Sequence, residues 1–151
     1  MGKQIKNEKI EMSDKEKQEM QQLYMQYEIM KQYSAVYTQE NNAIDAKLEE
    51  IGVTMEAVRE LPKMKKGNEF LTNLGSQVFM SAGITEHDKI IIELGSGVFG
   101  KKTTEEALVM LEKRKNELEK TSNQIMMELT SLNMQLKHLE PQLQEMMQRA
   151  Q

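Results

Sequence analysis

The sequence lacks cysteine and tryptophan, and among its 151 residues it has only two prolines, three phenylalanines and four tyrosines. Without cysteine the chain can form no disulfide, and it offers neither a thiolate nucleophile nor a cysteine-ligated metal site. So few aromatic side chains disfavour a single large globular core. Long apolar runs are also missing, and the first ten residues alternate charged with apolar side chains. A membrane span and a secretory signal peptide are therefore disfavoured, and we expect a cytoplasmic protein.

The chain has no excess of positive charge either. Its 24 acidic and 20 basic residues give a formal net charge of −4, so no bulk positive field exists to attract nucleic acid or anionic lipid. The cluster of Lys63, Lys65 and Lys66 is more typical of a solvated loop than of a nucleic-acid patch. His87 and His138 fall on separate elements without a carboxylate–serine constellation, which favours surface histidines. We expect no catalytic site, no metal and no cofactor.

Glutamate, lysine, leucine, glutamine and methionine are frequent, a usage typical of long helices and coiled coils. A first apolar seam advances in alternating steps of three and four residues, as a coiled coil requires. It predicts a helix about 48 Å long over residues 20–51, followed after Gly52 by a short second helix that Thr54 caps and Pro62 ends. The seam positions are Met20, Leu23, Tyr27, Met30, Ser34, Tyr37, Asn41, Ile44, Leu48 and Ile51.

A second and longer seam occupies the C-terminal third of the chain. Thr103-Thr-Glu-Glu106 at its start has the pattern of a capping box, so we expect the helix to begin there. Pro141 lies inside the seam, where its ring and missing N–H predict that the last ten residues are kinked or frayed. The seam positions are Leu108, Leu111, Lys115, Leu118, Ser122, Ile125, Leu129, Leu132, Leu136, Leu139, Leu143, Met146 and Ala150.

Between the seams the pattern changes to short apolar segments around Gly-Ser pairs. Residues 69–74 and 77–82 flank Gly75-Ser76, and residues 89–94 and 97–101 flank Gly95-Ser96. Glycine at the first position of a two-residue loop is typical of a type II′ turn. We therefore predict two β-hairpins, which form an internal repeat offset by twenty residues, Leu74-Gly-Ser-Gln-Val-Phe79 and Leu94-Gly-Ser-Gly-Val-Phe99.

These elements predict a mainly α fold with a small β insert. If the chain doubles back, the two seams form an antiparallel coiled-coil helical hairpin with the two β-hairpins at its closed end. Pairing Ile51 with Leu108 sets the register, and the polar seam positions then serve mainly to specify it. The predicted divisions are a polar N-terminal arm (1–19), a first coiled-coil helix with a short helix (20–61), the two hairpins (62–102) and a second coiled-coil helix (103–151).

The predicted strands are apolar on both faces. Ile90 and Ile92 lie on one face of their strand and Ile91 on the other. A strand of this kind needs cover on both sides, whereas one small sheet and the end of a coiled coil cover only one side. We expect the missing cover to come from other subunits, through oligomerisation of the hairpins.

The segment Gly95-Ser-Gly-Val-Phe-Gly100 fits the pattern G-x-G-x-x-G, and Gly95 to Lys101 fits most of a P-loop. Lys102 stands where that motif needs Ser or Thr to hold Mg²⁺. The sister turn at Gly75 repeats the Leu-Gly-Ser frame without the other glycines, which a hairpin explains and a phosphate cradle does not. We therefore favour turn geometry over nucleotide binding.

The segments Leu74-Gly-Ser-Gln-Val-Phe79, Asp88-Lys-Ile-Ile-Ile92 and Leu94-Gly-Ser-Gly-Val-Phe-Gly-Lys-Lys-Thr-Thr-Glu-Glu-Ala107, set between two coiled-coil seams, closely resemble the alpha subunits of archaeal prefoldins. The resemblance covers residues 20–150 and implies a hexamer of two alpha and four beta subunits. In such a hexamer the hairpins build an oligomeric β-barrel and the coiled coils hang down as tentacles. It further implies an ATP-independent holdase that captures unfolded client proteins and delivers them to a group II chaperonin.

The resemblance also assigns roles to residues of this chain. The polar arm before Met20 departs from the simplest family pattern, because Ser13 and Glu16 fill the next upstream seam positions. Client binding would fall on the coiled-coil tips, at Ile5, Ile10, Met12, Leu139, Leu143, Met146 and Met147. Oligomerisation would fall on Phe70, Leu71, Leu74, Val78, Phe79, Met80, Ile90, Ile91, Ile92, Leu94, Val98 and Phe99.

Two other functions compete with this interpretation. A coiled-coil scaffold or filament-forming assembly protein would use the same hairpins without binding clients. The fourteen methionines bear on this choice. At seam positions they fill a thin core, but Met12 and Met147 are not needed there, and flexible methionine side chains suit surfaces that accept many apolar partners. An enzyme is the weakest of the three hypotheses.

Overall fold

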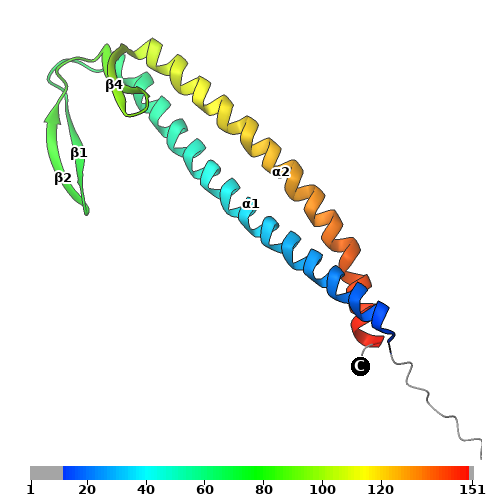
Figure 1. The fold of residues 1–151 in the computed structure, drawn as a ribbon. Coiled ribbons are helices and arrows are strands. Elements are labelled where there is room, and N and C mark those ends of the chain that lie inside the picture. The colour runs from blue at the N-terminus through cyan, green and yellow to red at the C-terminus, as the bar shows by residue number, and fades with distance from the viewer. Residues whose placement is uncertain (1–11, 150–151) are drawn as a thin grey trace, which may run out of the picture. The chain divides into compact units, whose positions relative to one another are not determined.

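A computed structural model of the chain describes residues 12–149. Two long helices, α1 (Asp14–Glu60) and α2 (Thr104–Arg149), enclose two β-hairpins in the sequence (Figure 1). A short 3₁₀ helix at Leu61–Lys63 follows α1. The predicted mainly α fold with a small β insert is confirmed.

The strands are β1 (Glu69–Gly75), β2 (Val78–Gly83), β3 (Lys89–Gly95) and β4 (Val98–Thr103). They form two separate two-stranded sheets, in which β1 pairs antiparallel with β2 and β3 pairs antiparallel with β4. Both predicted hairpins are therefore present, and neither extends into a larger sheet within the described chain.

The chain divides into two compact units. We call residues 12–42 of α1 with residues 123–149 of α2 the helical unit, and residues 43–122 the hairpin unit. In the helical unit the two helix segments run antiparallel (Figure 1). Every predicted seam position from Met20 to Ile51 and from Leu108 to Met146 is buried or half-buried. The alternating three- and four-residue spacing therefore identified the covered side of each helix correctly.

The first helix begins at Asp14, so the predicted start at Met20 lies six residues inside it. Ser13 and Glu16 form a capping box that the sequence analysis did not recognise. The Ser13 backbone N–H donates to Glu16 Oε2 at 2.8 Å, and the Glu16 N–H donates to Ser13 Oγ at 3.3 Å. Two unpaired donors of the first turn are thus satisfied, which explains why a polar segment starts the helix.

The predicted break at Gly52 is wrong, because α1 continues through this residue to Glu60. Thr54 does not cap a second helix. Its hydroxyl donates to the Glu50 carbonyl oxygen at 2.8 Å, one turn back along the same helix. Burial of Met55 and Val58 anchors this last part of the helix, and tertiary packing of this kind outweighs the modest cost of one glycine.

The second helix starts as predicted, and its end does not fray. Its capping box is confirmed, since the Thr103 N–H donates to Glu106 Oε2 at 3.0 Å and the Glu106 N–H donates to Thr103 Oγ1 at 3.1 Å. Pro141 lies inside α2, which remains helical to Arg149 instead of fraying. Leu143 is buried just beyond the proline, and its packing offsets the lost backbone hydrogen bond.

The turns of the two hairpins lie one residue later than predicted. The last paired residues are Gly75 with Val78 and Gly95 with Val98, so the loops are Ser76-Gln77 and Ser96-Gly97. Both residues of each loop have positive φ, at 48° and 63° in the first and 51° and 76° in the second. Positive φ at both positions is the mark of a type I′ turn, which matches the twist of a hairpin better than a type I turn does.

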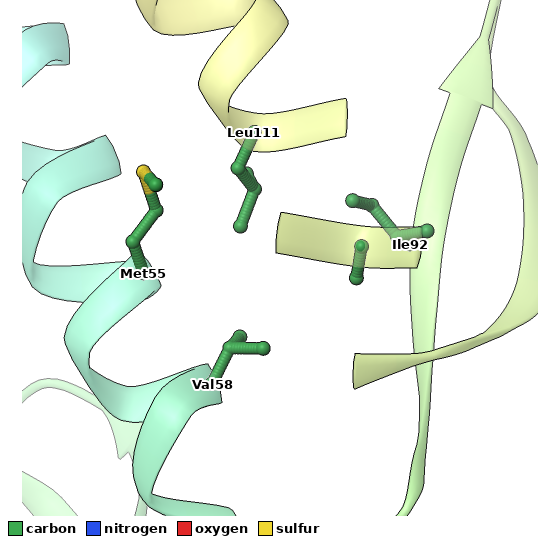
Figure 2. Close-up of a cluster of buried hydrophobic side chains, with 5 residues drawn as sticks. Met55, Val58, Ile92 and Leu111 are labelled. Atoms are coloured by element: carbon green, nitrogen blue, oxygen red, sulfur yellow. The ribbon is translucent and has the colours of Figure 1, made fainter. Parts of the chain in front are cut away.

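A small apolar cluster forms the core of the hairpin unit (Figure 2). It brings Ile92 of β3 together with residues of both helices, and Figure 2 shows the Ile92 side chain directed toward α2. Ile51 and Leu108, which the predicted register pairs, both pack against it. Its buried members are Met55, Val58, Ile92, Ala107 and Leu111.

The two loops differ in one residue, and this difference predicts unequal hairpin stability. A left-handed conformation costs a residue with a Cβ about 1–2 kcal/mol and costs glycine almost nothing. Gln77→Gly should therefore slow amide hydrogen exchange in β1 and β2 by about fivefold or more. Hydrogen-exchange mass spectrometry of the hairpin peptides measures this change.

Gly97→Gln is the matched reverse substitution, and it should speed exchange in β3 and β4 while leaving β1 and β2 unchanged. Equal exchange in wild type and Gln77→Gly would contradict the assignment of the loop to Ser76-Gln77.

Candidate functional site

The hairpins present the first candidate surface. All the large apolar side chains of β1 and β2 are exposed, and no residue of these two strands is buried. A two-stranded hairpin that covers neither face is marginal in water. This arrangement fits a hairpin that needs cover from another chain.

Strand β3 has one covered and one open face. Ile92 is 8% exposed in the intrachain cluster, whereas its neighbour Ile91 is 71% exposed. Ile92, predicted for oligomerisation, is therefore already used within the chain, and Ile90 is half-buried beside it. The predicted oligomerisation residues that the structure leaves exposed are Phe70, Leu71, Leu74, Val78, Phe79, Met80, Ile91, Leu94, Val98 and Phe99.

An arginine attaches the covered hairpin to the second helix. The Arg114 guanidinium on α2 donates a hydrogen bond to the Glu93 carbonyl oxygen of β3. This side chain also lines a groove of about 720 Å³ inside the hairpin unit, together with Ile51, Ile91 and Leu118. Polar and apolar contacts therefore both hold β3 against the helices, and no comparable contact holds β1 or β2 among the described residues.

The glycine-rich segment 95–101 is a hairpin turn followed by a strand, not a loop before a helix. Gly95 and Gly97 have positive φ, and a Cβ at Gly100 would lie 2.7 Å from Leu94 Cδ1. Turn geometry thus explains Gly95 and Gly97, whereas a Cβ at Gly100 would meet only the exposed Leu94 side chain. The Gly97 N–H, which would have to donate to a phosphate, already donates to Glu93 Oε1 at 2.9 Å.

The lysine of the apparent P-loop, Lys101, forms an ion pair with a glutamate. Lys101 Nζ lies 2.7 Å from Glu86 Oε2, and the hydrogen bond from this lysine holds the pKa of the exposed Glu86 carboxyl below its ordinary value. The geometry at the turn therefore offers two carboxylates and no free lysine, which is unfavourable for binding phosphate.

The residues predicted for the coiled-coil tips differ in how far they are buried. Met12 and Leu143 are buried, Leu139 and Met146 are half-buried, and Met147 is 50% exposed. Ile5 and Ile10 lie outside the described residues. Of the five predicted tip side chains that the structure describes, four are therefore at least half covered in the single chain, and Met147 is exposed.

Charged residues lie at the end of the helical unit where α1 begins and α2 ends. Hydrogen bonds from Ser13, first from its backbone N–H, hold the pKa of Glu16 below its ordinary value, and the positive charge of Arg149 adds to the effect. Arg149 also pairs with Glu145 one turn earlier on α2. The charge of Arg149 therefore reaches Glu16, so the first turn of α1 and the last turn of α2 lie at the same end of the helical unit (Figure 1).

A third surface, which the sequence analysis missed, lies on the sides of the helical unit. It consists of large apolar side chains outside the predicted seam. Four of them on α1 follow each other at steps of four, four and three residues, which places them on one side of the helix. The exposed residues are Tyr24, Met25, Ile29, Tyr33 and Val36 on α1 and Met126, Met127 and Met134 on α2. The four-, four- and three-residue spacing of these apolar residues on α1 would have revealed this surface in the sequence.

Two grooves run between the helix segments of this unit. One of about 460 Å³ is lined by Met25, Ile29 and Tyr33 of α1 and by Leu132 of α2. The other, of about 380 Å³, is lined mainly by α2 residues that include Met134. Gln26 and Met30 line both grooves, so the two grooves lie on either side of the seam residue Met30. Their volumes are within the range of about 300–1,000 Å³ that is usual for ligand pockets.

The part of the chain that the structure describes contains no group of three or more His, Cys, Asp or Glu residues arranged to hold a metal ion. No helix between residues 12 and 149 is long and apolar enough to cross a membrane.

The fold and these surfaces define a helical hairpin with exposed apolar β-hairpins. A sequence model of the family "Prefoldin subunit" matches residues 30–149, which is well over half of the chain. The protein therefore belongs to the prefoldin family of chaperone subunits.

Similarity to individual proteins agrees with this assignment. The prefoldin subunit alpha of Thermofilum pendens is 25% identical over 101 residues, which cover 67% of this chain and 78% of that protein. Alpha subunits of other archaea are similar to the same extent. The predicted resemblance to archaeal prefoldin alpha subunits is thus confirmed.

Solved structures share the fold. The cryo-EM structure of filamentous PFD from Methanocaldococcus jannaschii superposes with a TM-score of 0.67 at 16% identity, covering 76% of this chain and 95% of that one. The crystal structure of the prefoldin beta subunit from Thermococcus strain KS-1 gives a TM-score of 0.53 at 19% identity, covering 84% and 90%. These similarities support the helical hairpin with a β insert.

The occupied turn at residues 95–101 predicts that nucleotide has no effect on this protein. Isothermal titration calorimetry with millimolar ATP and Mg²⁺ should show no saturable heat. Lys101→Ala should remove only the solvent-exposed ion pair with Glu86, so the melting temperature should change little. A saturable ATP isotherm that Lys101→Ala abolishes would contradict the hairpin interpretation of this motif.

Proposed function

We propose that the protein is one subunit of an ATP-independent holdase that assembles with prefoldin beta subunits, captures non-native proteins and delivers them to a group II chaperonin. The observation that carries this proposal is the amount of large apolar surface that a member of a chaperone family exposes on both its hairpins and its helices.

Assembly through the hairpins follows from the physical cost of leaving them open. Burial of one large apolar side chain is worth about 1.5–3 kcal/mol, and ten such side chains are exposed on the four strands. Their combined burial can exceed the association cost of about 4–15 kcal/mol. The free edges of each two-stranded sheet can also pair with strands of a neighbour. An oligomeric β-barrel of two alpha and four beta subunits would use both the side chains and the edges.

The assembly proposal predicts that charges on the open strand faces disperse the oligomer. Phe79 and Ile91 are 57% and 71% exposed in the single chain, so replacing both by lysine leaves the intrachain core intact. The double variant Phe79→Lys with Ile91→Lys should lose the wild-type mass in light scattering while its helical circular dichroism stays nearly unchanged.

Val109→Lys is the matched control, because Val109 is 70% exposed on α2 and lines a groove formed by α2 residues. It should keep the wild-type mass. An oligomer of wild-type mass in the double variant would show that the hairpins do not hold the assembly.

Capture of clients is supported by the exposed methionines on both helices. Methionine side chains adapt to apolar partners of different shape. Weak contacts on several subunits around one cavity would combine through their high effective concentration. Met147 at the end of α2 and the exposed side chains on the flanks of both helices are the available contacts.

The alternative is a coiled-coil scaffold that assembles through the hairpins and holds no client. Aggregation of the insulin B chain, triggered by dithiothreitol, separates the two functions. This chain has no cysteine, so the reductant leaves it unchanged. The holdase proposal predicts that the protein, alone and with beta subunits, suppresses light scattering without ATP. Undiminished scattering at several-fold molar excess of the protein would favour the scaffold.

A further inference from the structure

The middle of the helical unit is nearly free of charge. We call residues 20–39 of α1 and 123–136 of α2 the neutral belt. Its charged side chains are Glu28, Lys31 and Glu128. The helix ends beyond the belt are rich in charge. Asp14, Lys15, Glu16, Lys17 and Glu19 precede the belt on α1, and Lys137, Glu140, Glu145 and Arg149 follow it on α2. The belt is therefore a distinct surface, bordered by charge on the side of the helix ends.

Exposed apolar side chains concentrate in this belt. Within the described helical unit, every large apolar side chain that is exposed lies in it except Met147. A surface helix of an ordinary coiled coil carries charged residues outside its seam. Here those positions hold tyrosine, methionine, isoleucine and valine, so seam packing cannot account for them.

The belt has a shape that suits a chain segment. Its two grooves lie on either side of Met30 between α1 and α2. Both are lined by apolar side chains and by neutral amides such as Gln26, and the second groove also reaches His138 just beyond the belt. Neutral amide groups can hydrogen-bond the backbone of a bound segment without demanding a countercharge. The grooves thus combine apolar contact with uncharged polar contact.

The chemistry of the belt selects its occupant. A charged partner would lose hydration without gaining a countercharge, which is unfavourable. A second copy of this helical hairpin would need charged flanking positions to fix its register, and the belt provides almost none. An apolar segment without charges meets neither obstacle, and the methionines allow segments of different sequence to pack.

We propose that the neutral belt, on the flanks of the helical unit and not at its ends, is the surface on which this subunit holds uncharged apolar segments of non-native polypeptides. The proposal rests on the holdase function and specifies where that function is carried out. The belt begins about 9 Å along α1 from Asp14 and extends about 29 Å further, so a bound segment would lie along the helices.

The methionines of the chain are built-in probes for this proposal. Hydrogen peroxide transfers one oxygen atom to an exposed thioether, which gives the sulfoxide and water. The full-length protein is treated with peroxide with and without reduced, alkylated α-lactalbumin, a permanently unfolded client, and oxidation of each methionine is followed by mass spectrometry. Client binding is measured in parallel by fluorescence anisotropy of the labelled client.

With client at ten times its Kd, oxidation of Met25, Met127 and Met134 should slow by about tenfold, whereas Met147 at the helix end and Met64 outside the helices should react at unchanged rates.

Protection of Met147 alone, or no protection while the client is bound, would overturn the proposal that the belt binds the client and leave the holdase function standing. Belt protection that appears without client and grows with protein concentration would identify a second copy as the occupant. Absence of client binding would overturn both proposals.

Paired substitutions provide an independent test. Met25→Gln with Ile29→Gln removes two exposed belt side chains, and Val53→Gln with Val109→Gln removes two similarly exposed side chains from the hairpin unit, at 63% and 70% exposure. Glutamine keeps the helices because its helix propensity is high. The belt pair should weaken client binding about tenfold with unchanged circular dichroism, while the control pair should bind like wild type. Equal affinity of the two pairs would contradict the proposal.

Discussion

The packing of Ile92 between the two helices is the contact on which the hairpin unit depends. Its side chain joins Met55 and Val58 of α1 to Ala107 and Leu111 near the start of α2. These segments are far apart in the sequence, and no cysteine is present to link them. Apolar burial at this point therefore holds the end of α1, strand β3 and the start of α2 together, with Arg114 adding one polar contact to β3.

The same constraint makes the two hairpins unequal although their sequences repeat. The hairpin of β3 and β4 buries Ile92, whereas the hairpin of β1 and β2 buries no side chain. Duplication of a turn motif thus produced one hairpin anchored within the chain and one that presents both faces outward. The outward hairpin and the open face of β3 carry large apolar side chains that the described chain leaves exposed.

In the helical unit, a thin seam is the whole core. Only Met12, Ile125 and Leu143 are buried there, so most apolar side chains of this unit remain partly or fully accessible. A larger core would cover them and leave nothing for a partner. The low aromatic content of the chain is consistent with this thin core, and the exposed apolar side chains of the unit gather in its uncharged middle.

The sequence by itself determined the elements that depend on local chemistry. Apolar spacing identified the covered side of both helices, the Thr103–Glu106 pattern located the start of α2, and the Gly-Ser pairs identified the hairpins to within one residue. Distant contacts decided the rest, because burial depends on which segments meet in space. Packing of Met55 and Val58 carried α1 through Gly52, and burial of Leu143 kept α2 helical beyond Pro141. Only the tertiary structure could separate buried Ile92 from exposed Ile91, since both are isoleucines in one strand and the position of the helices alone determines which face is covered.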